Sequence, residues 1–487
     1  MKVLLLNTPF LPMYSRASRS PAVTKSSTLY YPLWLAYTTG VLEEDDFEVR
    51  LIDAPAMRWE KENVYEFVRE FKPDLSIVDT TTPSIYSDEE IAKKIKKISG
   101  NTVILVGTHA SALPEQVLKE TENIDAVIRG EYDYIIRDIA RKIRRGEEWK
   151  KEKGISYINK NGKVIHNQDR EKIENLNEIP FVSKVYKNHL SRYIKRYFYG
   201  ANMHPVMTIL SGRGCPYKCC YCVYPQVMLG HKYRYRSVEN VVDELEYIKE
   251  NFPYVKEIFL EDDTLTINKE RTIELCREIV RRKLKIVWST NSRAQVDYET
   301  LKEMKKSGCR LLCVGYESGD QKVLDNIGKG LKLEEIYQFT KDAKKTGILI
   351  HGCFLVGNPG ETKETLEKTL EMAKKLNPDT AQFYPVMAYP GTRLYKWAEE
   401  NGYLKNKNFR EWVTKEGLHN CLVSTPHLTE KDLKEWADNA RREFYMRPKY
   451  IIRKLIQALR HPKEITRIIR GANSLLHFIF QKNGHST

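Results

Sequence analysis

Four of the chain's nine cysteines lie within eight residues, in the segment SGRGCPYKCCYCVYP. Three of them, Cys215, Cys219 and Cys222, have the spacing C-x3-C-x2-C. A structural zinc site takes four ligands, usually in two separated pairs, whereas three thiolates on one short loop suit an iron–sulfur cluster with one iron open to an outside ligand. The spacing therefore predicts a cluster on this loop, with a zinc loop or unrelated buried cysteines as the alternative.

The other cysteines do not form the pattern of a disulfide scaffold. Cys220 should point away from its neighbours along the loop, so we expect a packing or spare-thiol role for it. Residues 1–214 contain no cysteine, and the total is odd. Disulfides are rare in the cytosol, so this usage predicts a cytoplasmic protein. The aliphatic run in MKVLLLN is too short for a signal peptide, and no run reaches the roughly 18 apolar residues of a membrane span.

From residue 205 the sequence alternates short apolar runs with amphipathic stretches. Six such repeats within residues 205–400 predict a partial (β/α)6 barrel, an α/β fold. Active sites of barrels lie at the carboxyl ends of the strands. Here those ends carry the cysteine loop and the segments EDDT, STNSR, GYESG, GNPGE and YPGT. We therefore expect these loops to meet on one rim of the barrel.

Residues 1–145 show an earlier alternation of apolar runs and amphipathic stretches. Runs such as KVLLLN, DLSIVDTT and NTVILVG predict a doubly wound, Rossmann-like parallel sheet that binds its ligand at the carboxyl ends of its strands. No G-x-G-x-x-G follows the first run, so a dinucleotide is not favoured. The polar residues 146–204 predict a linker with a hairpin at the Asn-Gly of INKNGKVI. Residues 401–487 predict a helical C-terminal extension.

The cysteine loop, with the aromatic Tyr221 before its last cysteine, resembles the radical S-adenosylmethionine (SAM) superfamily. The resemblance implies that Cys215, Cys219 and Cys222 hold a 4Fe-4S cluster whose open iron binds SAM. It also implies that SAM is cleaved to a 5′-deoxyadenosyl radical, which abstracts a hydrogen from the substrate. The other strand-end loops match the superfamily more loosely. The implied SAM-binding residues are Tyr221, Asp263, Ser289, Arg293, Glu317, Gly357 and Pro359.

Each of these looser matches also has a structural explanation. Asp262 or Asp263 could cap the next helix, and Gly357 could serve a turn alone. Arg293 could be a solvated residue at a helix start, although a guanidinium at a strand end is well shaped for a carboxylate. The cysteine triad is the one specific signal among them.

The first 145 residues resemble the cobalamin-binding domain of the class that joins B12 to radical SAM chemistry. The segments LLLNTP, YYPLWLAYTTGVLEE, VILVGTHASALPEQVL and DAVIRGEYDYII carry the resemblance. The Asp-x-His-x-x-Gly signature of a cobalt ligand is absent, so we expect His109 to contact the corrin or its nucleotide tail instead. A vestigial sheet without cofactor is the alternative. The implied cobalamin-binding residues are Thr8, Pro9, Tyr31, Pro32, Thr81, Thr82, Gly107, Thr108, His109, Gly130 and Glu131.

The C-terminal tail is the most basic part of a chain whose net charge is +15. Residues 441–482 hold eleven Lys or Arg residues and two Glu. Aliphatic side chains recur among them at helical spacing, which predicts an amphipathic helix on an anionic membrane surface. A helix packed on the barrel with a solvated basic face is an equal alternative. Nucleic acid is disfavoured, because aliphatic rather than aromatic side chains accompany the charges. The aliphatic residues are Ile451, Ile452, Leu455, Ile456 and Leu459.

Within the B12 class, YYPLWLAY, RLIDAPA and TTTPSIYSDEE look most like members that modify lipid-linked sugars or polycyclic lipids, including the hopanoid and archaeal-lipid enzymes that contract a sugar ring. This resemblance implies modification of an unactivated carbon of a lipid or lipid-linked sugar, by C-methylation, rearrangement or ring contraction. It also implies an electron donor such as ferredoxin or flavodoxin. A radical SAM tRNA-modifying enzyme and a non-catalytic B12 or redox sensor are the alternatives. We expect a cytoplasmic protein whose tail reaches the inner face of the membrane.

Overall fold

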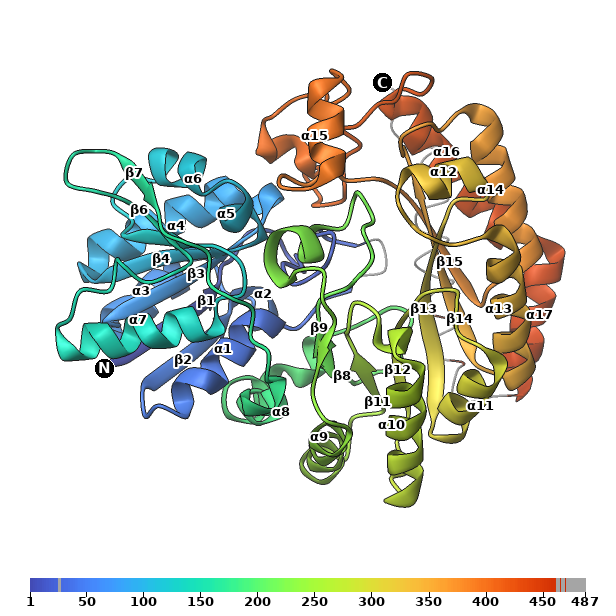
Figure 1. Cartoon of the computed structure of the whole chain (residues 1–487), viewed down its shortest axis with the longest axis horizontal. Helices are drawn as coiled ribbons and strands as arrows, with labels where there is room; N and C mark the ends of the chain where they lie inside the picture. The colour runs from blue at the N-terminus through green and yellow to red at the C-terminus, as the bar shows by residue number, and fades with distance from the viewer. Residues whose placement is uncertain (25–27, 461–464, 466–468, 470–487) are drawn as a thin grey trace.

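The computed structural model describes residues 1–24, 28–460, 465 and 469 (Figure 1). The described residues therefore include the first half of the predicted basic tail, residues 441–460, whereas 461–464, 466–468 and 470–482 lie outside them. Among the described residues, none of the helices has the length and apolar character needed to cross a bilayer. Two parallel sheets dominate the chain and lie side by side, the first in the blue half of Figure 1 and the second in the green and yellow half.

The first sheet has seven strands in the order β2-β1-β3-β4-β5-β6-β7, of which β1 to β5 are parallel. Its first five strands follow the flavodoxin-like order, which places a ligand crevice at the switch point between β1 and β3. The predicted hairpin is β6 and β7, and it pairs antiparallel with β5, so it extends this sheet. The strands are β1 (Lys2–Asn7), β2 (Glu48–Asp53), β3 (Leu75–Thr80), β4 (Thr102–Gly107), β5 (Ala126–Ile128), β6 (Ile155–Ile158) and β7 (Val164–His166).

Helices cover both faces of the first sheet (Figure 1). Helix α1 packs against α7, and α3 packs against α4. Burial on both faces is possible because the strands carry unbroken apolar runs, such as the fully buried residues 3–6 of β1. The helices are α1 (Leu33–Glu43), α2 (Ala54–Met57), α3 (Lys61–Phe71), α4 (Ile85–Ser99), α5 (Thr108–Ala112), α6 (Pro114–Glu120) and α7 (Asp133–Arg145), with a short η1 (Thr82–Ser84).

The second sheet is a six-stranded, all-parallel sheet in the order β15-β14-β13-β12-β11-β8. This is the predicted partial barrel, so the predicted α/β fold class is confirmed. Its strands are β8 (Val206–Ile209), β11 (Glu257–Leu260), β12 (Trp288–Ser292), β13 (Cys309–Glu317), β14 (Leu349–Val356) and β15 (Thr380–Pro385). A separate pair, β9 (Gly212–Arg213) and β10 (Arg234–Tyr235), is antiparallel. The two sheets are connected by helix α8 (Val182–Val185) and by the turns η2 (Leu176–Glu178), η3 (Tyr186–Leu190) and η4 (Ser191–Arg196).

Local capping explains where the barrel helices begin. The side chains of Ser237, Asn268 and Thr362 accept hydrogen bonds from backbone N–H groups in the first turns of α9, α10 and α14. The helices are α9 (Val238–Asn251), α10 (Lys269–Arg281), α11 (Tyr298–Lys306), α12 (Gln321–Asn326), α13 (Leu333–Thr346) and α14 (Lys363–Leu376), with turns η5 (Tyr224–Leu229) and η6 (Leu265–Ile267).

The C-terminal extension runs from the barrel back to the first sheet and then onto the outside of the barrel. It comprises α15 (Arg393–Glu400), η7 (Phe409–Trp412), α16 (Glu430–Tyr445) and α17 (Pro448–Arg460). Phe409 of η7 packs edge to face on His109 of α5, beside the first sheet, with ring centroids 4.8 Å apart. Helix α16 then covers β15 (Figure 1). The extension therefore ties the two sheets together.

Candidate active site between the two sheets

The cysteine loop follows β8, the first strand of the barrel, and is held by backbone hydrogen bonds from two other segments. The N–H of Cys220 donates to the carbonyl of Ile327 (2.9 Å), and the N–H of Leu394 donates to the carbonyl of Cys220 (3.0 Å). The side-chain amide of Gln226 donates to the carbonyl of Cys222 (2.8 Å). Cys220 is thus anchored by its backbone and buried, whereas Cys215 and Cys222 are partly exposed.

The three spaced thiols fit a group that carries its own positive charge. Burial, reinforced by Asp263, raises the pKa of Cys215 to about 11 and the pKa of Cys222 well above its ordinary value. Without a metal both sulfurs are therefore neutral thiols, and bound iron would reverse this preference. Within the described part of the chain, no three His, Cys, Asp or Glu side chains converge on one metal ion. A cubane does not require convergence, because each of its thiolates binds a different iron.

Tyr221 of the cysteine loop, which is partly buried, meets a buried pair formed by Glu317 and Lys329. The Tyr221 hydroxyl and the Lys329 ammonium each lie 2.8 Å from Oε1 of Glu317. Glu317 ends β13 with a φ of 66°, a left-handed conformation that an L-residue adopts only when its surroundings hold it. Among the described residues, nothing donates to its other oxygen, Oε2, which is buried. Sequence reasoning missed Lys329, which has no distinctive spacing.

A second set of carboxylates meets an arginine from the first sheet. Arg19, in the long loop after β1, pairs with Glu261 and Asp263 in the loop after β11, with Arg19 Nη2 3.0 Å from Asp263 Oδ1. Arg19 also donates to the backbone carbonyl of Glu261 (2.9 Å). In the described chain, Oε2 of Glu261 and Oδ2 of Asp263 are buried without a hydrogen-bond donor. Both carboxylates line a small cavity between the sheets that Arg19, Trp34 and Tyr224 also line.

The remaining SAM candidates lie in different surroundings. The guanidinium of Arg293 lies 3.4 Å from the ring centroid of Tyr217 on the cysteine loop and donates to the carbonyl of Gly330 (3.1 Å). Ser289 is not on the rim: it lies near the start of β12, where its hydroxyl accepts a hydrogen bond from Asn202 (2.6 Å). A buried carboxylate, Glu257, shares the same Asn202 amide.

The loop after β14 contains the last two SAM candidates. Gly357 has a φ of 94°, and a Cβ there would lie 2.9 Å from Leu433 of α16. The carbonyl of Pro359 accepts a hydrogen bond from Asn326 (3.0 Å). Asn326 precedes Ile327, whose carbonyl holds the cysteine loop. Glu361 accepts a hydrogen bond from the N–H of Asn358 (2.9 Å), and burial raises its pKa to about 7. The loop is therefore braced from both sides.

The cobalamin candidates after β1 and β3 belong to one buried polar network at the predicted switch point. Thr8 donates to Asp88 (2.5 Å), which also pairs with Arg16 (2.6 Å). The hydroxyls of Thr81 and Tyr14 lie 2.8 Å apart. Thr8 and Thr81 thus have partners within the chain, and these bonds join the loops after β1 and β3. Pro9 continues the first of these loops.

The loop after β4 is shaped by a glycine and a buried imidazole. Gly107 has a φ of 101°, and a Cβ there would lie 2.4 Å from both Asp79 and the Thr80 carbonyl, so the turn requires glycine. His109 is buried, and its Nδ1 lies 3.1 Å from the hydroxyl of Thr82. Burial lowers the pKa of His109 to about 3, so the ring is neutral. The intervening Thr108 begins α5.

A pH experiment tests the burial of His109. Its pKa is about 3 in the folded chain and 6.5 ordinarily, so below pH 6.5 the unfolded chain binds more protons. Stability should therefore fall as the pH drops, by about 2 kcal/mol at pH 5 for this group. The variant His109→Gln lacks this contribution. Denaturant unfolding at pH 7 and pH 5 should show a smaller loss in the variant, and equal losses would contradict the assignment.

Other cobalamin candidates lie in the interface between the sheets. The Tyr31 hydroxyl donates to the carbonyl of Val206 in β8 (2.8 Å), and Pro32 directly precedes α1. Glu131 pairs with Arg213 (2.8 Å) and Arg234 (2.9 Å) of the β9–β10 ribbon. Although burial disfavours its charge, the two guanidiniums hold the pKa of Glu131 below its ordinary value. These residues join the sheets.

Two groups near this interface suit a cofactor rich in amides. The hydroxyl of Tyr132 is buried and has no partner among the described residues. Burial raises the pKa of Asp79, at the end of β3, to about 7. Gly130 turns the chain two residues before Tyr132, and its N–H donates a hydrogen bond to the hydroxyl of Ser111 (3.0 Å). An unpaired hydroxyl and a protonatable carboxyl can both bond amide side chains such as those on a corrin, so the first sheet fits cobalamin.

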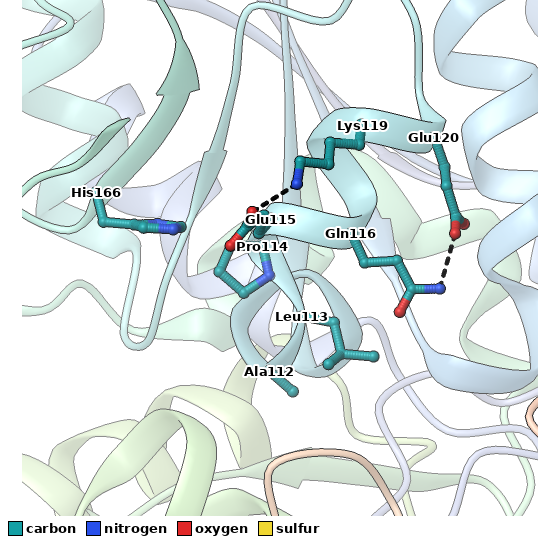
Figure 2. A pocket seen from close by; sticks show the side chains of 8 residues that line it. All are labelled: Ala112, Leu113, Pro114, Glu115, Gln116, Lys119, Glu120 and His166. Carbon is teal, nitrogen blue, oxygen red and sulfur yellow. Dashed lines mark hydrogen bonds and ion pairs between the residues drawn. The ribbon is translucent and has the colours of Figure 1, made fainter. Parts of the chain in front are cut away.

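A separate groove lies at the edge of the first sheet, beside α5, α6 and the β6–β7 hairpin (Figure 2). Lys119 lies 2.6 Å from Glu115, and the neutral amide of Gln116 donates to Glu120 (2.9 Å). His166 faces this pair across the groove (Figure 2). The lining thus carries two carboxylates and one ammonium, and His166 is its other titratable group.

Comparison with known proteins identifies both halves of the chain. The model of the B12 binding domain matches residues 19–140, and the model of the radical SAM superfamily matches residues 209–373. A solved methyltransferase, TsrM from Kitasatospora setae with cobalamin and a [4Fe-4S] cluster bound, has the same fold, with a TM-score of 0.69 and 18% identity over 92% of this chain and 89% of that one. The fold and the site thus define an enzyme that combines a corrinoid-binding sheet with a radical SAM barrel.

Sequence relatives place the chain in a family. It is 34% identical to an uncharacterized methyltransferase of Pyrococcus horikoshii over 90% of this chain and 93% of the relative. It is 30% identical to the anaerobic magnesium-protoporphyrin IX monomethyl ester cyclase of Rubrivivax gelatinosus over 75% and 66%, and 24% identical to the hopanoid C-3 methylase of Methylococcus capsulatus over 78% and 70%. The chain belongs to the cobalamin-dependent radical SAM enzymes. Its cofactors are a 4Fe-4S cluster, SAM and cobalamin, which confirms the predicted family and cofactors.

Proposed function

We propose that this enzyme transfers a methyl group to an unactivated carbon of a lipid or lipid-linked substrate. The observation that carries methylation is the 34% identity to a protein named as a methyltransferase, over nearly its whole length. The hopanoid methylase among the relatives supports a lipid as the acceptor. When bound, the cluster and SAM supply a carbon-centred radical, and cobalamin supplies a transferable methyl group.

The geometry supports a reaction between the two sheets. The pair of Arg19 with Glu261 and Asp263 brings the loop after β1 of the first sheet to the loop after β11 of the barrel. The same Asp263 acts electrostatically on Cys215 and Cys222. The residues that would hold the cluster and the loops that would hold cobalamin thus approach each other at this interface, which is where we propose that the substrate carbon would be modified.

We assign the residues of the site on this basis. Cys215, Cys219 and Cys222 bind the cluster. The carboxylates of Asp263 and Glu317 and the hydroxyl of Tyr221 bind and orient SAM, with Gly357 and Pro359 beside its adenine and Arg293 bracing the loop. Ser289 is left out of this set, because its hydroxyl is taken by Asn202 at the other end of the strand. Reduction of the cluster requires an electron donor of the ferredoxin or flavodoxin class.

Isotope labelling tests the methyl transfer. The reconstituted enzyme, given SAM with a deuterated methyl group, a reductant and lipids extracted from the source cells, should form 5′-deoxyadenosine and S-adenosylhomocysteine and add a deuterated methyl group to one lipid. Formation of 5′-deoxyadenosine without S-adenosylhomocysteine would contradict methylation. That outcome would favour an oxidative cyclisation or rearrangement, for which the 30% identity to a cyclase is the supporting observation.

A further inference from the structure

Helix α17 is fixed to the outside of the barrel by one of its faces. The Tyr450 hydroxyl donates to the carbonyl of Asp379 (2.8 Å), and the guanidinium of Arg453 donates to the carbonyls of Asn377 (2.6 Å) and Pro378 (2.5 Å). These carbonyls lie in the turn between α14 and β15, where a helix end leaves acceptors unpaired. The orientation of α17 is therefore set, and its opposite face points away from the barrel.

That opposite face is apolar and exposed. Ile452 is 56% exposed, Leu455 is 61% exposed and Leu459 is 81% exposed, and Ile451 and Ile456 are both 43% exposed. At 100° per residue, positions 452, 455, 456 and 459 fall within one narrow arc of the helix. They form a single stripe, which we call the α17 stripe.

The α17 stripe is unusual for this molecule. Of the twelve large apolar side chains that are strongly exposed among the described residues, eight lie between positions 446 and 469. The other four, such as Val280 on α10, lie singly on separate elements. Scattered apolar residues are normal on a surface, whereas a contiguous stripe marks a binding surface.

The surroundings of the α17 stripe are positively charged. Helix α17 contains Lys449, Arg453, Lys454 and Arg460 and no acidic residue. Lys449 is exposed at the start of the helix. Two of these cations face the barrel: Arg453 donates to the carbonyls of the turn, and Lys454 is buried with its Nζ 3.7 Å from Oδ1 of Asp379. The exposed cation beside the stripe in the described part of α17 is therefore Lys449.

We propose that the α17 stripe lies on the surface of a membrane that contains anionic lipids. The aliphatic side chains would enter the boundary between headgroups and acyl chains, and Lys449, together with the positive charge that the sequence carries after position 460, would attract the lipid phosphates. This arrangement leaves the tethered face of α17 on the barrel, so the whole enzyme would be held at the lipid surface from which it takes its substrate.

Charge disfavours the other occupants. A second copy of the chain in a two-fold interface would set one basic helix against another. The chain beyond position 460 is also basic, with four Lys or Arg residues and one Glu in 461–482. RNA would meet the cations, but stacking requires exposed aromatic rings, and the stripe is aliphatic.

Co-sedimentation with vesicles tests the proposal on the full-length protein. We expect binding to vesicles of phosphatidylglycerol and phosphatidylcholine in equal parts, and much weaker binding to phosphatidylcholine alone. Leu455→Glu and Leu459→Glu should each weaken binding by about tenfold, because each places a charge where an aliphatic side chain would be buried. Added salt should weaken binding as well.

A matched control separates the stripe from general surface charge. Val280→Glu makes the same kind of change at an exposed apolar residue of α10 that has Arg281 and Arg282 beside it, and it should bind vesicles as the unmodified chain does. Equal binding by Leu455→Glu and the unmodified chain would overturn the proposal, as would equal affinity for both kinds of vesicle. A dimer that Leu455→Glu dissociates, or RNA binding without vesicle binding, would also overturn it. Vesicle binding needs no cofactor, so its failure leaves the proposed methylation intact.

Discussion

Each of the single variants Cys215→Ala, Cys219→Ala and Cys222→Ala will lose the iron–sulfur cluster, whereas the variant Cys220→Ala will keep it. A site-differentiated cluster has three protein ligands, so loss of one leaves too few to hold the cubane. After anaerobic reconstitution with iron and sulfide, the three single variants should lack the visible absorbance of the cluster and its bound iron. They should also form no 5′-deoxyadenosine.

Cys220→Ala is the matched control for this experiment, because it removes a thiol from the same loop. The backbone of Cys220, not its sulfur, makes the bonds to Ile327 and Leu394 that hold the loop. A cluster that survives in Cys219→Ala but not in Cys220→Ala would contradict the assignment, and one zinc per chain in place of iron would support the zinc alternative.

Much of the architecture could be predicted because parallel sheets leave a strong sequence signal. Strands buried on both faces require unbroken apolar runs, and such runs alternate with amphipathic helices along both halves of the chain. The cysteine loop could be placed at a strand end for the same reason. The hairpin of residues 155–166 was predicted as well, but its pairing with β5 was not, because the partner of an edge strand leaves no mark in the sequence.

The site was harder to predict, because its residues interact across long stretches of chain. Arg19 pairs with Glu261, which lies more than two hundred residues later in the sequence, and no local spacing of residues predicts such a pair. Ser289 was predicted at the rim because the segment STNSR looks like a loop. Strand β12 continues through Ser292, however, so Ser289 lies near the start of the strand.

Tyr31 and Glu131, which were predicted to bind cobalamin, show a related difficulty. A buried tyrosine or glutamate in a strand-end loop can serve a cofactor or a neighbouring domain, and the sequence does not distinguish these roles. In the structure, Tyr31 bonds to β8, and Glu131 pairs with two arginines of the barrel. Some strand-end loops that were predicted to bind the cofactor therefore pack against the other domain.

Lys329→Met should be the most destabilising single change in the proposed SAM site. Lys329 and Glu317 form an ion pair of 2.8 Å whose side chains are 7% and 6% exposed. Burial alone would lower the pKa of Lys329, but the carboxylate more than offsets this and raises it. Loss of the lysine leaves a buried carboxylate with the Tyr221 hydroxyl as its remaining donor, which should cost about 3 kcal/mol. The thermal midpoint of the barrel should fall by about 6 to 10 °C.

Two further variants make this result specific. Lys322→Met removes an exposed lysine seven residues earlier and should change stability by less than about 0.5 kcal/mol. The double variant Glu317→Gln with Lys329→Met removes both charges and should recover most of the stability, because no buried charge remains unpaired. It should still bind SAM more weakly, since the proposed contact of Glu317 is lost. Full stability in Lys329→Met alone would show that water reaches Glu317, and the buried pair would then not exist in solution.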